Sequence, residues 1–239
     1  LSLELGGKSP FIVFADADLD AAVEGVVNSI WFNQGQVCCA GSRLLVQESV
    51  EGLFLRKLRD RMMQIRVGDP LDKCTDMGAL ISTEQLQRVR HYIELGRQEG
   101  GDVFQTEVAS LEQGCFCPPT LISGLETCST LMQEEIFGPV LVSTSFRTPN
   151  EALELANNSR FGLAAGVFTT DVQRAHRVAG QLKAGICWIN NYNITPIEMP
   201  FGGVGESGIG SENSMAAPDH YTQLKTVYVE MGEVATGYR

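Results

Sequence analysis

The chain has few basic residues, little histidine and no long apolar run. It carries 18 Lys and Arg against 29 Asp and Glu in 239 residues, which gives a net charge of −11. This balance disfavours nucleic acid and anionic membrane surfaces as partners, because both are bound through clustered positive charge. No stretch approaches the roughly twenty consecutive apolar residues of a spanning helix, so no membrane partner is expected.

Secretion signals and a disulfide framework are also missing. The first residues lack an initiator Met, a basic segment and a cleavage site, and they read as the middle of a strand, so we expect the chain to begin inside a longer protein. Seven Cys, an odd number with one adjacent pair, favour a reducing, cytoplasmic location. Cys115 and Cys117 lack two further ligands at zinc-site spacing, so no structural zinc is expected.

Strand-like and helix-like segments alternate along the chain. Apolar positions from Leu19 to Ile30 predict a helix that continues to Gly35. We expect further helices at 50–66, 83–99, 149–157 and 171–182, and strands at 11–14, 43–47, 102–105, 120–123, 140–146, 165–169 and 185–190. Segment 108–119 has no periodicity and is expected to be a loop. This alternation predicts an α/β fold with a mainly parallel sheet flanked by helices.

One cysteine stands in a setting suited to covalent catalysis. Asp18 can cap the helix at 19–30, Gly35 is expected to stop it, and Cys38 then falls in the turn before the strand at 43–47. A thiolate is a strong nucleophile near neutral pH. Glu4, which lies 34 positions earlier, could activate the water that releases a covalent intermediate. The alternative for Cys38 and Cys39 is a pair of small buried apolar residues.

Four segments, in order, resemble the aldehyde dehydrogenase superfamily. They are Leu-Glu-Leu-Gly-Gly-Lys-Ser-Pro at 3–10, Asn-Gln-Gly-Gln-Val-Cys at 33–38, Glu-Glu-Ile-Phe-Gly-Pro at 134–139 and Pro-Phe-Gly-Gly at 200–203. Segments 161–169, 190–193 and 223–227 are most similar to betaine-aldehyde and aminoaldehyde dehydrogenases. The resemblance covers nearly the whole chain and implies the family's α/β catalytic domain.

The resemblance also implies how the chain is divided. Residues 1–6 would end an NAD-binding domain that lies upstream, residues 7–210 would form the catalytic domain, and residues 211–239 would carry an oligomerisation strand at 225–231. The alternating pattern at 223–231 predicts a strand that pairs either within the domain or with a neighbouring subunit of a homodimer or homotetramer. The determinants of NAD against NADP would lie upstream, so both cofactors stay open.

The resemblance assigns catalytic roles to three residues. Cys38 corresponds to the nucleophile, because the family places it directly after Gly-Gln-Xaa, and Cys39 is its rival. Glu4 corresponds to the general base for hydrolysis of the thioester. Glu212 resembles a glutamate that partners an upstream lysine in a proton relay, and that lysine is not in this chain.

The resemblance also identifies residues that would hold the cofactor. Glu135 corresponds to the carboxylate that accepts the ribose hydroxyls, and Phe137 to the ring beside the nicotinamide. Leu5 would meet the nicotinamide amide through its backbone. Without the resemblance, Glu134 and Glu135 would read as an exposed acidic pair.

Aromatic side chains are candidates for a substrate channel. Phe32, Trp31 and Phe201 could contact a small aldehyde that carries an ammonium group, through cation–π attraction. Core packing is the alternative for each, and it is favoured for Trp31. Glu198 could add charge complementarity, although an ordinary exposed loop carboxylate is the favoured reading.

The glycine-rich segment 202–210 departs from the family pattern. A lysine usually stands where this chain has Gly205, and an arginine commonly stands where it has Ser211. Betaine-aldehyde relatives can hold potassium through backbone carbonyls of this loop, so Gly205 and Gly208 are candidate potassium ligands. The departure at Ser211 leaves the subunit contacts near it open.

Three functions fit the sequence. The first is NAD(P)-dependent oxidation of an aldehyde to a carboxylic acid through a Cys38 thiohemiacetal and thioester, with betaine aldehyde or an aminoaldehyde as substrate and the isolated chain inactive. The second is a non-catalytic structural or partner-binding fragment of the same fold. The third is a redox sensor formed by Cys38 and Cys39.

Overall fold

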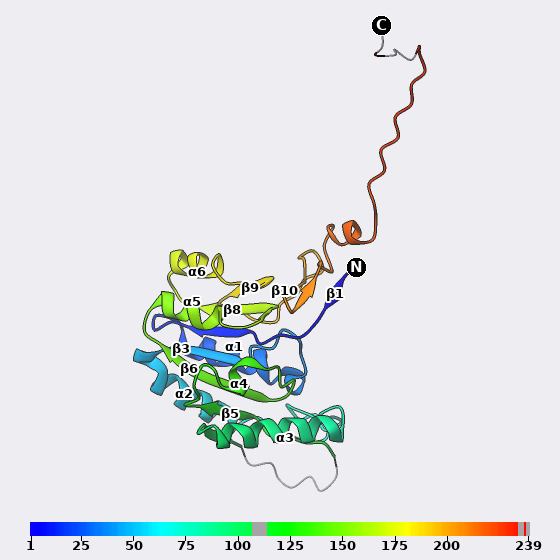
Figure 1. Cartoon of the computed structure of the whole chain (residues 1–239). Helices are drawn as coiled ribbons and strands as arrows, with labels where there is room; N and C mark the ends of the chain where they lie inside the picture. Colours follow the sequence, from blue (N-terminus) through cyan, green and yellow to red (C-terminus); the bar gives the residue numbers. More distant parts are fainter. Residues whose placement is uncertain (107–113, 234–236, 238–239) are drawn as a thin grey trace.

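The computed structural model describes residues 1–106, 114–233 and 237, and its centre is a seven-stranded sheet (Figure 1). The strand order is β4-β5-β6-β3-β2-β8-β9, and every neighbouring pair is parallel except β4 with β5. The α/β prediction is therefore confirmed. The strands are β2 (Pro10–Val13), β3 (Arg43–Gln47), β4 (Asp102–Gln105), β5 (Thr120–Ser123), β6 (Val140–Phe146), β8 (Ala164–Phe168) and β9 (Ile186–Ile189).

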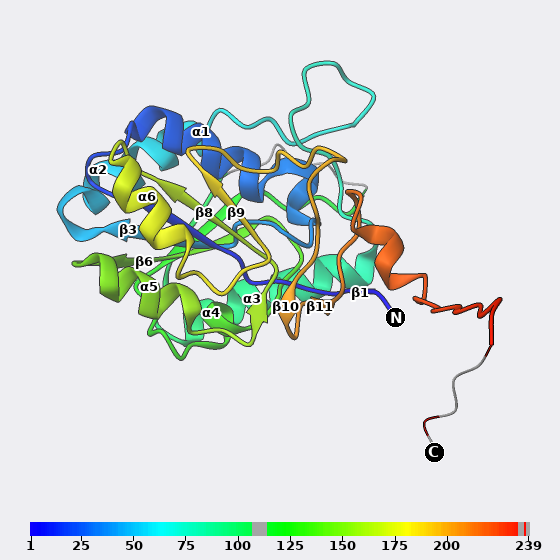
Figure 2. The same cartoon turned by 90° about the horizontal axis from the view of Figure 1, so that it is seen from above.

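Helices cover both faces of this sheet (Figure 2). Helices α1 (Leu19–Ile30) and α2 (Glu48–Met62) pack on one face. The other face carries α3 (Thr83–Gln98), α4 (Thr130–Gln133), α5 (Pro149–Asn157) and α6 (Val172–Ala179). Within the described residues, no helix is both long and apolar enough to cross a membrane.

Helix α1 delivers the chain to the cysteine turn. The Asp18 carboxylate accepts from the backbone N–H groups of Asp20 and Ala21, as the predicted cap requires. The helix ends at Ile30, earlier than the expected stop at Gly35, and a 3-10 turn, η1 (Phe32–Gly35), follows it. Asn33 and Gln34 have φ of 49° and 59°, so the left-handed backbone interrupts the helix before the glycine is reached.

Two small sheets fasten the glycine-rich segment. Strand β1 (Leu3–Glu4) pairs antiparallel with β11 (Gly208–Ile209), and β7 (Phe161–Gly162) pairs with β10 (Val204–Gly205). These pairs join residues about two hundred and about forty positions apart, a separation at which no local pattern signals pairing. They hold the segment after residue 200 beside the first residues of the chain.

The predicted strand at 223–231 is not formed within the chain. After the second 3-10 turn, η2 (Ala217–His220), the segment runs away from the body as an extended, exposed stretch (Figure 1). A strand needs a neighbouring edge to satisfy its N–H and C=O groups, and no described part of the chain offers one here. Pairing within the domain is therefore wrong, and pairing with another subunit stays a prediction. Of the loop expected at 108–119, residues 108–113 lie outside the described residues, and residues 114–119 form neither helix nor strand.

Candidate active site

Three chain segments meet at one edge of the sheet. Gly7 and Lys8 precede β2, Cys38 precedes β3, and Glu135 and Phe137 precede β6. Because β2, β3 and β6 are adjacent and parallel, their amino ends lie at the same edge. The sheet thus brings together the predicted nucleophile and the predicted cofactor residues, which are almost a hundred positions apart in sequence.

Cys38 lies in a turn and is partly accessible. Its carbonyl oxygen packs against Gly7, where an added Cβ would lie 2.6 Å from it. Gly35, with φ of 71°, packs just as closely against the backbone of Gly138. Small residues therefore let the cysteine turn approach both neighbouring segments.

The environment of Cys38 favours its thiolate. Its pKa is lowered to about 7, chiefly by a hydrogen bond from the Cys39 side chain, with further help from the backbone N–H groups of Cys39 and Cys38 itself. Burial and the negative charge of Glu4 oppose this shift. A substantial fraction of Cys38 is then ionised at neutral pH, as a nucleophile requires.

Cys39, the rival of Cys38 in the sequence, is a buried hydrogen-bond donor. Its pKa is raised, because its S–H is the donor to Cys38 and because it is buried. The same S–H lies 3.6 Å from Asn193 Oδ1, so two acceptors compete for one proton. Tyr192 donates its hydroxyl hydrogen to the Cys39 carbonyl at 2.8 Å and holds the turn from the opposite side.

Glu4 lies within electrostatic range of Cys38, but its side chain is exposed in this chain. The pKa of Glu4 is raised by partial burial and by the charge of Glu212. Glu212 accepts hydrogen bonds from Ser2 Oγ at 2.6 Å and Tyr221 OH at 3.0 Å, and these bonds lower its pKa.

Glu135 is fixed by backbone. The Gly7 N–H donates to its Oε1 at 3.0 Å, and its carboxylate lies so close to Gly6 that an added Cβ there would overlap it. Within the described residues, Oε2 accepts no hydrogen bond from protein. One carboxylate oxygen is thus anchored while the other is available to hydroxyl donors.

Phe137 presents its ring outward from a strained backbone. Its side chain is 39% exposed and its φ is 60°, which is uncommon for a bulky residue. Leu5, the third predicted cofactor residue, is also exposed. An exposed ring, an exposed backbone segment and a half-held carboxylate fit the ribose and ring of a nicotinamide cofactor.

Helix α3 supports this segment through side chains that the sequence analysis did not identify. Gln85 Nε2 donates to the carbonyls of Phe137 at 2.8 Å and of Ile136 at 3.1 Å. Arg88 donates to the Glu135 carbonyl at 2.9 Å, and Tyr92 OH donates to Glu134 at 2.6 Å. The three donors follow a spacing of three and four, which places them on one helix face and could have indicated a polar stripe.

The aromatic candidates separate into exposed and buried residues. Phe32 is 61% exposed and lines a cavity of about 220 Å³ with Asn28 and Met77, so core packing is excluded for it. Trp31 is buried and donates its indole N–H to the Pro139 carbonyl at 3.2 Å, as the core reading favoured. Phe201 packs partly against the core, and Cys38 does not line the cavity. Glu198 is exposed.

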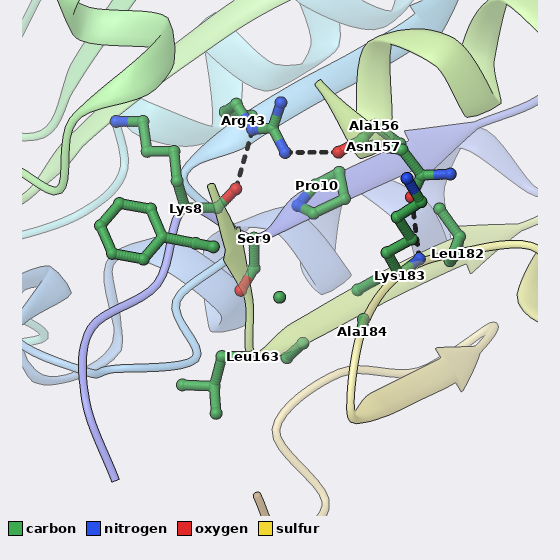
Figure 3. A pocket seen from close by; sticks show the side chains of 14 residues that line it. Lys8, Ser9, Pro10, Arg43, Ala156, Asn157, Leu163, Leu182, Lys183 and Ala184 are labelled. Carbon is green, nitrogen blue, oxygen red and sulfur yellow. Dashed lines mark hydrogen bonds between the residues drawn. The ribbon is translucent and has the colours of Figure 1, made fainter. Parts of the chain in front are cut away.

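The sequence analysis also missed two buried cations beside the site, Lys8 and Arg43. Arg43, the first residue of β3, donates to the carbonyls of Lys8 at 2.8 Å and Ala156 at 2.7 Å (Figure 3), and to that of Leu155 at 3.0 Å. The last two carbonyls end α5, where a positive charge is favourable. Beside them is a cavity of about 10 Å³, which is room for about one water.

The glycines proposed as potassium ligands are required by the backbone. Gly205 has φ of 62°, and an added Cβ would lie 2.8 Å from the Arg160 carbonyl. Gly208 lies tightly against Leu3 in the β1–β11 pair. Among the described residues no group of three or more His, Cys, Asp or Glu side chains could hold a metal, and carbonyl-bound potassium stays a prediction.

Comparison with known families decides what this site belongs to. The model of the "Aldehyde dehydrogenase family" matches residues 1–227. The chain belongs to the aldehyde dehydrogenase family. The chain is 50% identical to a betaine aldehyde dehydrogenase of Cereibacter sphaeroides and 47% identical to one of Brucella ovis, over its whole length and about half of theirs.

Solved structures agree with this assignment. An NAD-dependent aldehyde dehydrogenase from Sinorhizobium meliloti has a TM-score of 0.96 at 40% identity, and the match covers 100% of this chain and 48% of that one. A betaine aldehyde dehydrogenase from Staphylococcus aureus in complex with NAD+ has a TM-score of 0.89 at 41% identity, covering 92% and 44%. The chain spans about half the length of the relatives it matches.

Proposed function

We propose that the protein oxidises an aldehyde to a carboxylic acid with a nicotinamide cofactor, through a covalent adduct on Cys38. The observation that carries this proposal is a partly accessible thiol with a pKa of about 7, at the same sheet edge as the anchored Glu135 carboxylate. Membership of the aldehyde dehydrogenase family supports the reaction type. The non-catalytic alternative explains neither the lowered pKa nor the available carboxylate oxygen.

The proposed reaction has an addition step, a hydride-transfer step and a hydrolysis step. The Cys38 thiolate adds to the aldehyde carbon and forms a thiohemiacetal. When bound, the nicotinamide supplies the acceptor for the hydride that leaves this carbon, and a thioester remains on sulfur. Glu4 takes a proton from the water that attacks the thioester, which releases the acid and restores the thiolate. Glu212 would then exchange the proton of Glu4 with solvent.

The test is the loss of activity in the full-length protein. Cys38→Ala is expected to lower aldehyde-dependent NADH formation by orders of magnitude, because it removes the proposed nucleophile. Cys74→Ala, which removes an exposed thiol, is the matched control and should leave the rate unchanged. Undiminished turnover in Cys38→Ala would reject the proposal.

A second variant separates acylation from hydrolysis. Glu4→Gln should still form the acyl-enzyme in a rapid burst but hydrolyse it slowly, because the amide cannot accept the proton of water. Rapid-quench detection of the Cys38 adduct measures both steps. Deacylation as fast as in the parent protein would remove Glu4 from this role.

The cofactor is proposed to be NAD, because relatives of similar structure are described as NAD+ complexes. The proposed substrate is betaine aldehyde, supported by relatives named betaine aldehyde dehydrogenases, or an aminoaldehyde, supported by the sequence resemblance. A panel that compares these with simple aliphatic aldehydes tests the choice. Equal kcat/KM for all of them would reject specificity for an ammonium-bearing aldehyde.

The extended segment after Tyr221 supports a homo-oligomer in which this segment adds to a partner's sheet. The side chains of Leu224, Val227 and Met231 are exposed there and are not buried by any described part of the chain. Sedimentation of the full-length protein with and without residues 222–239 tests this. A monomer in both cases would reject it.

Comparison of activity in potassium and in sodium salts tests the ion site at Gly205 and Gly208.

A further inference from the structure

Lys8 is a buried cation with no hydrogen-bond partner for its ammonium group. Its side chain is 1% exposed, and Nζ has no partner among the described residues. An ammonium group in such a position costs free energy of folding, because it loses its hydration without gaining a partner. The proposed reaction gives Lys8 no role.

The charges around Lys8 show which way the ammonium acts. Its side chain runs away from the small cavity at β2 (Figure 3). Arg43 faces it from β3, and Glu134 and Glu135 face it from the segment before β6. Burial lowers the pKa of Lys8 to about 7, Arg43 adds to this shift, and Glu135 and then Glu134 oppose it. Arg43 is positive and repels the Lys8 ammonium, and its own charge is directed at three carbonyls. The ammonium therefore attracts the two carboxylates, Glu135 and Glu134.

Backbone next to Lys8 holds the same carboxylate. The Gly7 N–H donates to Glu135 Oε1 at 3.0 Å, and Gly6 lies in contact with the carboxylate group. Arg43 in turn binds the carbonyl of Lys8 at 2.8 Å. The segment 6–8 is therefore a fixed platform under Glu135, and the Lys8 ammonium is its only formal charge.

We propose that Lys8 is a positioning residue of the cofactor site, whose buried positive charge holds the Glu135 carboxylate on the platform formed by Gly6 and Gly7. Held in this way, Glu135 keeps its other oxygen directed at the ribose hydroxyls of the nicotinamide half. The inference rests on the proposed function and goes beyond it by assigning the buried lysine a part in cofactor affinity. It explains why an unfavourable buried charge is kept.

The test measures affinity and stability together in the full-length protein. Lys8→Met should raise the Kd for NAD+, measured by calorimetry, by about tenfold, which corresponds to about 1.4 kcal/mol. The same variant should unfold at an equal or higher denaturant concentration, because an unpartnered buried charge has been removed. Lys183→Met, which removes an exposed ammonium on the far side of the cavity, is the matched control and should change neither quantity.

A double-mutant cycle identifies the partner. In the Glu135→Gln background, Lys8→Met should have little further effect on the Kd, because the charge it acts on is gone. An unchanged Kd in Lys8→Met, or an equal loss in both backgrounds, would overturn the inference. If NAD+ does not bind the parent protein at all, the proposed function fails instead.

A measurement on unaltered Lys8 decides the matter if Lys8→Met does not fold. In the Cys38→Ala background, which removes the cysteine whose pKa is also lowered to about 7, NAD+ affinity should weaken as the pH rises through about 7. The reason is that Lys8 then loses the charge that holds Glu135. An affinity that is constant from pH 6 to pH 8.5 would overturn the inference.

Discussion

At the residue scale, the reactivity of Cys38 depends on the one proton of its neighbour. The Cys39 S–H can bond to the Cys38 sulfur or to Asn193 Oδ1, and only the first bond stabilises the thiolate. The two residues are adjacent in a turn, and the partner amide comes from a segment more than 150 positions away. If Cys38 is the nucleophile, Cys39 is therefore its hydrogen-bond donor and not a bystander.

Removal of this donor should make Cys38 a weaker acid. In Cys39→Ala the pKa of Cys38 is expected to rise from about 7 by about one unit or more, because a hydrogen bond to the charged form is lost. The pH dependence of iodoacetamide alkylation, followed on the Cys38 peptide by mass spectrometry, measures it. Asn193→Ala, which removes only the competing acceptor, should not raise the midpoint. An unaltered midpoint in Cys39→Ala would show that the donor is unimportant.

At the element scale, helix α3 acts as a support for the cofactor segment. Gln85 bonds two successive carbonyls around Phe137, whose left-handed backbone is otherwise unfavourable for an aromatic residue. The helix and the segment belong to different parts of the chain and meet only in the fold. Their contact fixes where the exposed ring of Phe137 points.

Gln85→Ala should loosen this segment and weaken cofactor binding. Two hydrogen bonds are lost, at about 1 kcal/mol each, so the Kd for NAD+ of the full-length protein should rise by about 10- to 30-fold. Gln98→Ala, on the last turn of the same helix, is the control, because Gln98 makes only a 3.4 Å contact with Glu94. Equal affinities in the two variants would contradict the supporting role.

Elements with a strong local pattern could be predicted from sequence. The bounds expected for β3, β4, β5, β6 and α5 agree with the structure, because alternation and buried runs define strands locally. Helices α2 and α6 differ from the expected bounds by a few residues at their ends; α6 stops at Gly180, whereas the apolar pattern runs on to Leu182. The two-residue strands β1, β7, β10 and β11 could not be predicted, since long-range pairing alone creates them.

The residues of the candidate site also divide into those that the sequence identified and those that only the fold reveals. Cys38, Glu4, Glu135 and Phe137 were identified by resemblance, and the structure gathers three of them at the amino ends of adjacent strands. The roles of Lys8, Arg43 and the polar stripe of α3 depend on burial and on contacts across the fold. No spacing within the sequence encodes those contacts, so pattern alone could not reveal them.

At the scale of the whole molecule, the parallel sheet brings segments that are far apart in the chain to one edge, where the candidate active site lies. Because the strands are parallel, each connection returns through a helix and brings a new segment to the same side. The turn that holds Cys38 and the segment that holds Glu135 are two such returns, and they lie beside the lysine platform that precedes β2. The buried and perturbed groups gathered there also govern how the stability of the fold depends on pH.

The free energy of unfolding should therefore rise with pH between about 7 and 9. In this window the folded state has already released protons from Lys8 and Cys38, whose pKa values are lowered to about 7, while the unfolded chain still binds them. Each such group adds a slope of up to about 1.4 kcal/mol per pH unit. The slope should be reduced by roughly half in Lys8→Met, as measured by urea unfolding at a series of pH values.

Above about pH 9 the trend should reverse. Burial raises the pKa of Cys117 and Cys187 to about 11 and raises that of Tyr192 further, so the folded state keeps protons that the unfolded chain releases. Stability then falls with rising pH, by the same relation with opposite sign. Cys187→Ala should reduce this alkaline decline and leave the rise between pH 7 and 9 intact. A stability that is flat across both windows would mean that these groups titrate alike in the folded and unfolded chains, which would also remove the reason for regarding Lys8 as a costly buried charge.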